Sequence, residues 1–261
     1  MFPITELTLK KIKEPAFLVM FIFAVVLGFC VSGLEVFTDN ESASIVGQLI
    51  SPQKGSPLLS SSFFAIGITI VIAVFTAATE IPRDVDTRMV MMLITKPIRK
   101  FDYLLGKYIG ILLLCMLVFA VTEMTIVVTH YLNTNELYTF KIIARQFYLL
   151  VILFPLVAIT IAISCFTGDI SAMIFTVLYM LFSISISMLP LLMAVLPESM
   201  TGGLESYILL IYYFFPNFIY FFQTFNLVGI TAVATVIYSL SITVIFLVIA
   251  AVRLKNRDLI P

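Results

Sequence analysis

Long apolar segments follow one another through most of this sequence, and they decide what the chain can fold into. A membrane-spanning helix needs about 20 consecutive, mostly apolar residues. Six segments reach or approach that length, over residues 16–34, 63–79, 103–129, 147–166, 170–195 and 227–252. A bilayer core offers no water to backbone polar groups, so each span must satisfy its own hydrogen bonds. We therefore predict an all-α integral membrane protein with six transmembrane helices.

The composition supports a membrane protein. Charged residues make up 11% of the chain and hydrophobic residues 61%, whereas a soluble domain carries about 25% charged residues. The net charge of +0 gives no indication of a nucleic-acid partner. Cys30, Cys115 and Cys165 lie far apart inside apolar segments, with no second ligand at metal-binding spacing. We expect them to be packing residues and expect no metal site.

The distribution of basic residues predicts the orientation. If six spans begin with a cytoplasmic N-terminus, the outer segments hold only Lys54, Lys141 and Arg145, and the other twelve of the 15 Lys and Arg residues are inside. This bias follows the positive-inside rule, so we predict that both termini are cytoplasmic and that residues 1–261 form a single transmembrane domain. Residues 1–15 are interpreted as an interfacial N-terminal helix, with a frayed basic tail as the alternative.

The segment 207–222 is apolar but short, and Pro216-Asn217 interrupts it. Counting it as a span would put the basic C-terminus outside, so we interpret it as a re-entrant outer segment before the sixth span. Its many Tyr and Phe residues also fit an aromatic belt at the membrane interface. Elsewhere Pro155, Pro190 and Pro197 are predicted to kink or end their helices.

The stretch from 79 to 110 carries the most information, because a short loop would be enough between the second and third spans. Pro82 suits the first position of a helix, and Lys96 precedes Pro97, which ends one. We therefore predict an amphipathic cytoplasmic helix over 82–95. One face holds Val85, Met89, Met92 and Leu93, and the polar residues are Arg83, Asp84, Asp86 and Arg88. Charges of both signs favour docking to another protein, and the alternative is a solvated interfacial helix.

The same stretch resembles the signature of type-2 ABC-transporter permeases, and most closely the branch of the nitrous-oxide-reductase maturation permeases. The matching residues are Glu80-Ile81-Pro82-Arg83, Arg88, Leu93-Ile94-Thr95-Lys96-Pro97-Ile98-Arg99 and Leu105-Gly106-Lys107-Tyr108. Asp84 and Met89 depart from that pattern, which has Glu and Thr there. The resemblance is weaker over the rest of the chain.

The resemblance implies a permease subunit that pairs with a second one, as a homodimer or heterodimer, above separate ATP-binding cassette subunits. ATP and Mg would then be bound by the partner, and this chain would be neither an enzyme nor a cofactor-binding protein. The only Gly-Lys pair, Gly106-Lys107, lacks the remainder of a phosphate-binding loop. The expected location is the inner or plasma membrane of a prokaryote.

The resemblance also assigns roles to residues. The helix 82–95 would be the coupling helix, and its expected ATPase contacts are Glu80, Arg83, Asp84, Asp86, Arg88, Met89 and Met92. Residues expected to anchor the segment to anionic lipid headgroups are Lys96, Arg99, Lys100 and Lys107. Glu123, inside the third span, is a candidate pathway residue, with a structural hydrogen bond as the alternative.

The resemblance implies that this subunit exports its substrate. Because the spans contain no line of ionisable residues, we expect that substrate to be lipidic, glycan or drug-like. Two alternatives come from other functional classes. One is an energy-transmitting membrane module that drives an extracytoplasmic protein, for example in metalloenzyme maturation, without moving a solute. The other is a stand-alone secondary transporter, for which only Glu123 is a candidate intramembrane charge.

Overall fold

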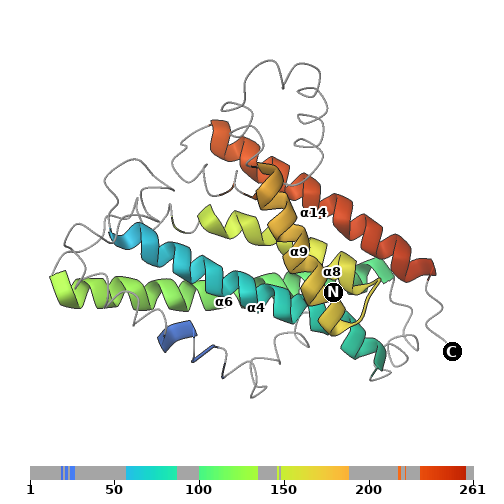
Figure 1. The fold of residues 1–261 in the computed structure, drawn as a ribbon, viewed down its shortest axis with the longest axis horizontal. Coiled ribbons are helices and arrows are strands. Elements are labelled where there is room, and N and C mark those ends of the chain that lie inside the picture. The colour runs from blue at the N-terminus through green and yellow to red at the C-terminus, as the bar shows by residue number, and fades with distance from the viewer. Residues whose placement is uncertain are drawn as a thin grey trace.

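The computed structural model describes residues 19, 21–22, 24–26, 57–86, 100–134, 146, 148–187, 217–218, 221 and 230–256. All regular secondary structure in this part of the chain is helical (Figure 1). The elements are α4 (Pro57–Asp86), α6 (Lys100–Thr134), η2 (Leu149–Ile152), α8 (Leu153–Ser164), α9 (Asp169–Ser187) and α14 (Ile230–Asn256). The predicted all-α class is confirmed for these residues.

Four of these helices are long and apolar enough to cross a membrane, over Phe64–Asp84, Phe101–Leu132, Asp169–Ile186 and Val233–Leu254. They coincide with the second, third, fifth and sixth predicted spans. The fourth predicted span contains the apolar helix Leu149–Ser164, which is shorter than the other four. The first has six described residues, all helical. The interfacial helix at 1–15 lies outside the described residues.

The short helix α8 lies at the centre of the bundle. It packs against α4, α6, α9 and α14, and all its residues except Phe154 and Ile163 are buried. A helix that is apolar on every side must be surrounded by other protein elements. This explains why the least polar segment of the fold is also its central one.

The outer helices α9 and α14 keep one face away from this core. On α9 the side chains of Ile170 and Ile174 are 73% and 54% exposed, and on α14 those of Val233 and Val244 are each 59% exposed. Exposed apolar side chains at helical spacing are compatible with a lipid environment. The opposite faces contribute Ala172 and Ala250 to the buried part of the bundle.

The end of α4 differs from the sequence-based prediction. The helix continues through Pro82 to Asp86, so Pro82 lies inside α4 and not at the first position of a new helix. The Thr79 hydroxyl donates back to the carbonyls of Phe75 and Thr76 at 3.0 and 3.3 Å, and so does not cap a following helix. A proline near the end of a helix removes only one backbone hydrogen bond, so a helix can continue past it. The sequence pattern alone did not distinguish a proline that begins a helix from one near a helix end. Residues 87–95 of the predicted helix lie outside the described residues.

Part of the predicted re-entrant segment packs against α14. Asn217, Phe218 and Phe221 are all buried. The Asn217 amide donates to the Tyr238 hydroxyl at 3.1 Å, and the Phe221 ring stacks on the Tyr238 ring with centroids 6.0 Å apart. These three residues therefore face protein, not lipid. The remainder of 207–222, with Pro190 and Pro197, lies outside the described residues.

Candidate functional site

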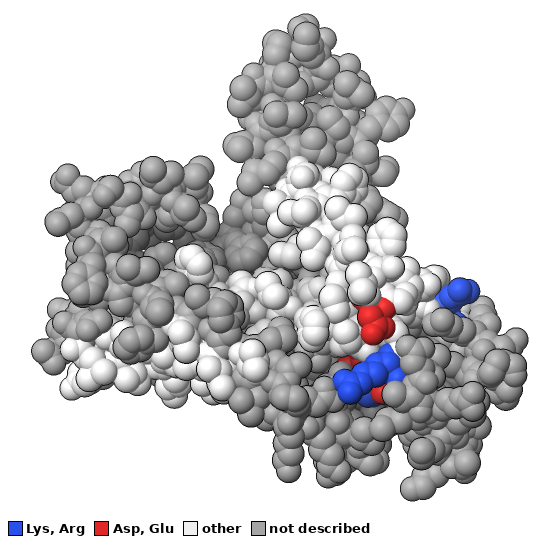
Figure 2. All heavy atoms as spheres, turned by 60° about the horizontal axis from the view of Figure 1, so that its bottom comes forward, with Lys and Arg blue, Asp and Glu red and all other residues white. Residues whose placement is uncertain are grey.

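The described charged side chains gather mainly at one end of the bundle, which we call the charged end. Here α4 ends, α6 begins, α8 turns into α9 through Cys165–Gly168, and α14 ends. Figure 2 shows basic and acidic groups side by side there, next to helices whose other visible side chains are uncharged. Arg253 of α14 also lies at this end, where its guanidinium is 5.1 Å from the ring centroid of Phe166.

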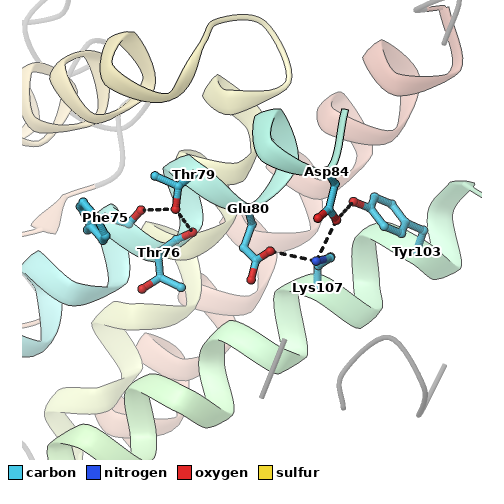
Figure 3. A network of polar contacts seen from close by, with 7 residues as sticks. All are labelled: Phe75, Thr76, Thr79, Glu80, Asp84, Tyr103 and Lys107. Carbon is cyan, nitrogen blue, oxygen red and sulfur yellow. Dashed lines mark hydrogen bonds and ion pairs between the residues drawn. The ribbon is translucent and has the colours of Figure 1, made fainter. Parts of the chain in front are cut away.

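Four side chains from two helices form a polar cluster at this end, which we call the α4–α6 brace: Glu80, Asp84, Tyr103 and Lys107 (Figure 3). Lys107 donates to Glu80 Oε2 at 2.8 Å and pairs with Asp84 Oδ2 at 2.8 Å. The Tyr103 hydroxyl donates to the same Asp84 oxygen at 2.5 Å. Each helix contributes two residues spaced four apart, which places them on one face of the helix. Because α4 and α6 run antiparallel, the two pairs meet in register.

The brace is buried. Glu80 is 1% exposed, Lys107 is 3% exposed and Asp84 is 7% exposed. Removing charges from water is costly, and only close pairing with additional hydrogen bonds compensates for that cost. Lys107 supplies the pairing to both carboxylates, and the Tyr103 hydroxyl adds a hydrogen bond. The brace therefore fixes the end of α4 to the beginning of α6.

This geometry bears on three of the predicted site residues. Glu80 and Asp84 contact α6, and Lys107 is buried between them. Their expected contacts with an ATPase and with lipid headgroups stay predictions. The resemblance assigned these roles from the motif alone, which does not show that the two carboxylates and the lysine face each other. Arg83, by contrast, is exposed at the end of α4.

The other predicted site residues are placed only in part. Asp86 and Lys100 are the last residue of α4 and the first of α6. Glu123 is 2% exposed in α6, about 24 Å along the helix axis from Lys107 at 1.5 Å per residue. The structure therefore does not bring Glu123 to the brace. Further members of the predicted set lie outside the described residues, namely Arg88, Met89, Met92, Lys96 and Arg99.

Tyr103 belongs to the brace but was not predicted from the sequence. The sequence did contain an indication of this role. Tyr103 and Lys107 are four residues apart, as are Glu80 and Asp84, so each pair lies on one face of its helix. Within the described residues there is no group of three or more His, Cys, Asp or Glu side chains that could hold a metal ion. Cys115 and Cys165 are buried and form no disulfide, as expected of packing residues.

The comparison with protein families covers almost the whole chain. The sequence model of the ABC-2 family transporter proteins matches residues 8–259. The chain belongs to this family. Members of the ABC-2 family are membrane components of ABC transporters and work with ATPase components. As an ABC-2 permease with several apolar helices, this chain is a multi-pass membrane subunit of such a transporter. The comparison with curated proteins gives no match.

Proposed function

We propose that this ABC-2 permease couples ATP hydrolysis in a separate ATPase subunit to export of a lipidic, glycan or drug-like substrate. The observation that carries the proposal is the α4–α6 brace. It ties the end of α4, where a partner would act, to the beginning of α6, a helix of 35 residues that runs through the bundle. A displacement of the end of α4 would therefore move α6 with it.

The proposed ATPase contact is the segment from Arg83 through Asp86, Arg88, Met89 and Met92. It begins where the described part of α4 is exposed, at Arg83. Glu80 and Asp84 act indirectly, since they hold this segment against α6. Mixed charges on an exposed segment set the register of a partner, which fits a protein groove better than a lipid surface.

The orientation proposed for the bundle puts the charged end in the cytoplasm. The excess of Lys and Arg in the segments at that end supports it, and so does the need for an ATPase to reach the end of α4. Lys96, Arg99 and Lys100 are then the proposed contacts with anionic headgroups. Glu123, buried in a candidate span, is the proposed pathway residue. The motif between Glu80 and Tyr108 supports the proposal that the chain belongs to the branch of the nitrous-oxide-reductase maturation permeases.

The test is to purify the chain from its native membrane in mild detergent and to identify what accompanies it. We expect a stoichiometric ATP-binding cassette protein. In the doubly reversed variant Arg83→Glu/Arg88→Glu its recovery should fall at least about tenfold, which corresponds to about 1.4 kcal/mol of binding free energy.

Arg253→Glu is the matched control, because it reverses an exposed arginine at the same end but on α14. It should retain the ATPase. Absence of any ATPase from the unaltered, folded chain would contradict the proposal, and so would full recovery with the double variant.

A further inference from the structure

At the start of helix α8, in the centre of the bundle, one backbone hydrogen bond of a continuous α-helix is missing, and we call this position the break. Proline has no amide hydrogen, so Pro155 cannot donate to the carbonyl of Val151, four residues earlier in an α-helix. The residues just before α8, Leu149–Ile152, are wound as the 3-10 helix η2. Gln146 and Tyr148, before η2, are also helical, so η2 has helical residues on both sides, and a 3-10 stretch within a helix often marks a hinge. The break is buried, since Val151 is 9% exposed and Leu153 is 0% exposed.

Hydroxyl groups from two neighbouring helices hold the backbone on either side of this break. Ser239 of α14 donates to the Val151 carbonyl at 2.9 Å. Tyr108 of α6 donates to the Phe154 carbonyl at 3.2 Å. Most of the other described Ser and Thr hydroxyls bond back within their own helix, as Ser241 does to Ile237 at 2.8 Å. Ser239 differs from them, because its hydroxyl bonds to the backbone of another helix.

The same contacts link the break to the charged end. Tyr108 follows Lys107 directly in α6, and Lys107 is the member of the brace that pairs with α4. Two consecutive residues of helix α6 thus make the two contacts. Lys107 pairs with α4, and Tyr108 bonds to the backbone of α8 beside the break.

We propose that Ser239 and Tyr108 are positioning residues for transport, and that the Pro155 break is the hinge at which movement of α4 and α6 reaches α8. This rests on the proposed function, since the movement is the one that the ATPase would start. A proline removes a hydrogen bond that bending would otherwise have to break, and hydroxyls of neighbouring helices satisfy the freed groups in a membrane. The hinge can bend while Ser239 and Tyr108 keep it attached to α14 and α6.

The first test is thermodynamic and follows from the missing amide. Ser239→Ala should lower the midpoint of thermal unfolding of the purified complex, whereas Ser241→Ala should leave it unchanged. In Pro155→Ala an amide can again donate to the Val151 carbonyl. In that background Ser239→Ala should lower the unfolding midpoint by roughly half as much or less. Such a departure from additivity is expected only of coupled groups. Equal effects of Ser239→Ala in both backgrounds would show that Ser239 does not serve the break.

The second test follows movement by hydrogen exchange of the complex with its ATPase in lipid nanodiscs. Exchange is compared without nucleotide and after trapping with ADP and vanadate. In the unaltered chain, trapping should change exchange in the peptides that cover 80–86 and 149–154. In Ser239→Ala, Tyr108→Phe and Pro155→Ala the change at 80–86 should remain and the change at 149–154 should be lost. Ser241→Ala should retain both.

These outcomes separate the two proposals. If trapping changes exchange at neither peptide of the unaltered chain, the proposed coupling function is wrong. If exchange changes at 80–86 but not at 149–154, or if the variants retain both changes, only the hinge is wrong. A purely structural role of Ser239 or Tyr108 would raise exchange equally in both nucleotide states.

Discussion

At the scale of single residues, the brace shows how a membrane bundle accommodates charges that its apolar surroundings disfavour. Lys107 lies 2.8 Å from an oxygen of each of two carboxylates, and all three groups are almost fully buried. Such a cluster adds little stability over a well-packed apolar one, but removal of Lys107 leaves two carboxylates buried without a cation. Its value is therefore geometric, because it fixes the register of α4 against α6.

Lys107→Met should strongly destabilise the protein, because Glu80 and Asp84 are left buried without their cation. We expect a loss of about 3–5 kcal/mol, measured as thermal or denaturant unfolding of the purified chain in detergent. The triple variant Glu80→Gln/Asp84→Asn/Lys107→Met removes all three charges and should recover most of the loss. Arg83→Met, at an exposed neighbour, should cost far less, because the interactions of exposed charges contribute little to stability. Wild-type stability of Lys107→Met would contradict the buried pairing.

Tyr103→Phe tests the remaining member of the brace. The substitution removes the hydroxyl that donates to Asp84 at 2.5 Å and leaves the ring in place. We expect a smaller loss than for Lys107→Met, about 1.5–3 kcal/mol for a hydrogen bond to a charged group. Tyr131→Phe, at an exposed site on the same helix, is the matched control. A loss no larger than that of Tyr131→Phe would show that the hydroxyl is not needed.

At the scale of elements, the arrangement depends on α8. It is the shortest of the main helices, yet it contacts all four others. Its small residues let neighbouring backbones approach, which is the usual basis of helix packing in membranes. Ala158 and Ala162 are 0% and 2% exposed. Packing at α8 therefore decides how the long helices are placed relative to one another.

Ala158→Leu should destabilise the bundle by about 1–3 kcal/mol, because the added atoms have no space at a fully buried site. Ala234→Leu is the matched control, since Ala234 is exposed on α14. It should have little effect on stability. Unfolding in detergent measures both, and equal midpoints for the two variants would contradict a central, closely packed α8.

At the scale of the whole molecule, α4 and α14 run toward the charged end, and α6 begins there (Figure 1). This end combines the brace, exposed Arg83 and the contact of Arg253 with Phe166. The remaining surface of α9 and α14 is largely apolar. Such a polarised molecule suits a subunit that meets a soluble partner at one end and lipid around its sides.

Cysteine accessibility tests the orientation of the whole molecule. In a chain with Cys30 replaced by Ser, Leu132→Cys lies at the exposed far end of α6, and Arg253→Cys lies at the charged end. A membrane-impermeant maleimide should label Leu132→Cys in intact cells and Arg253→Cys only after permeabilisation. Cys115 and Cys165 are buried and should react little in either case. The opposite pattern would place the charged end outside the cell.

Sequence patterns were enough to predict a helical membrane protein, which the described residues confirm, and to locate the second, third, fifth and sixth spans. These features depend on local apolar length, which is read directly along the chain. The sequence also singled out the segment from Glu80 to Tyr108 as the place where charge gathers, although it did not show which of those charges face each other.

The burial of Lys107 between Glu80 and Asp84, the contact of Tyr103 with Asp84 and the bond from Ser239 to the Val151 carbonyl became visible only in the folded bundle. Each of these contacts joins residues of different helices, the last pair from positions 88 apart in sequence. The partner of a buried polar group is set by how helices pack, and that packing is a property of the assembled bundle, not of any one segment.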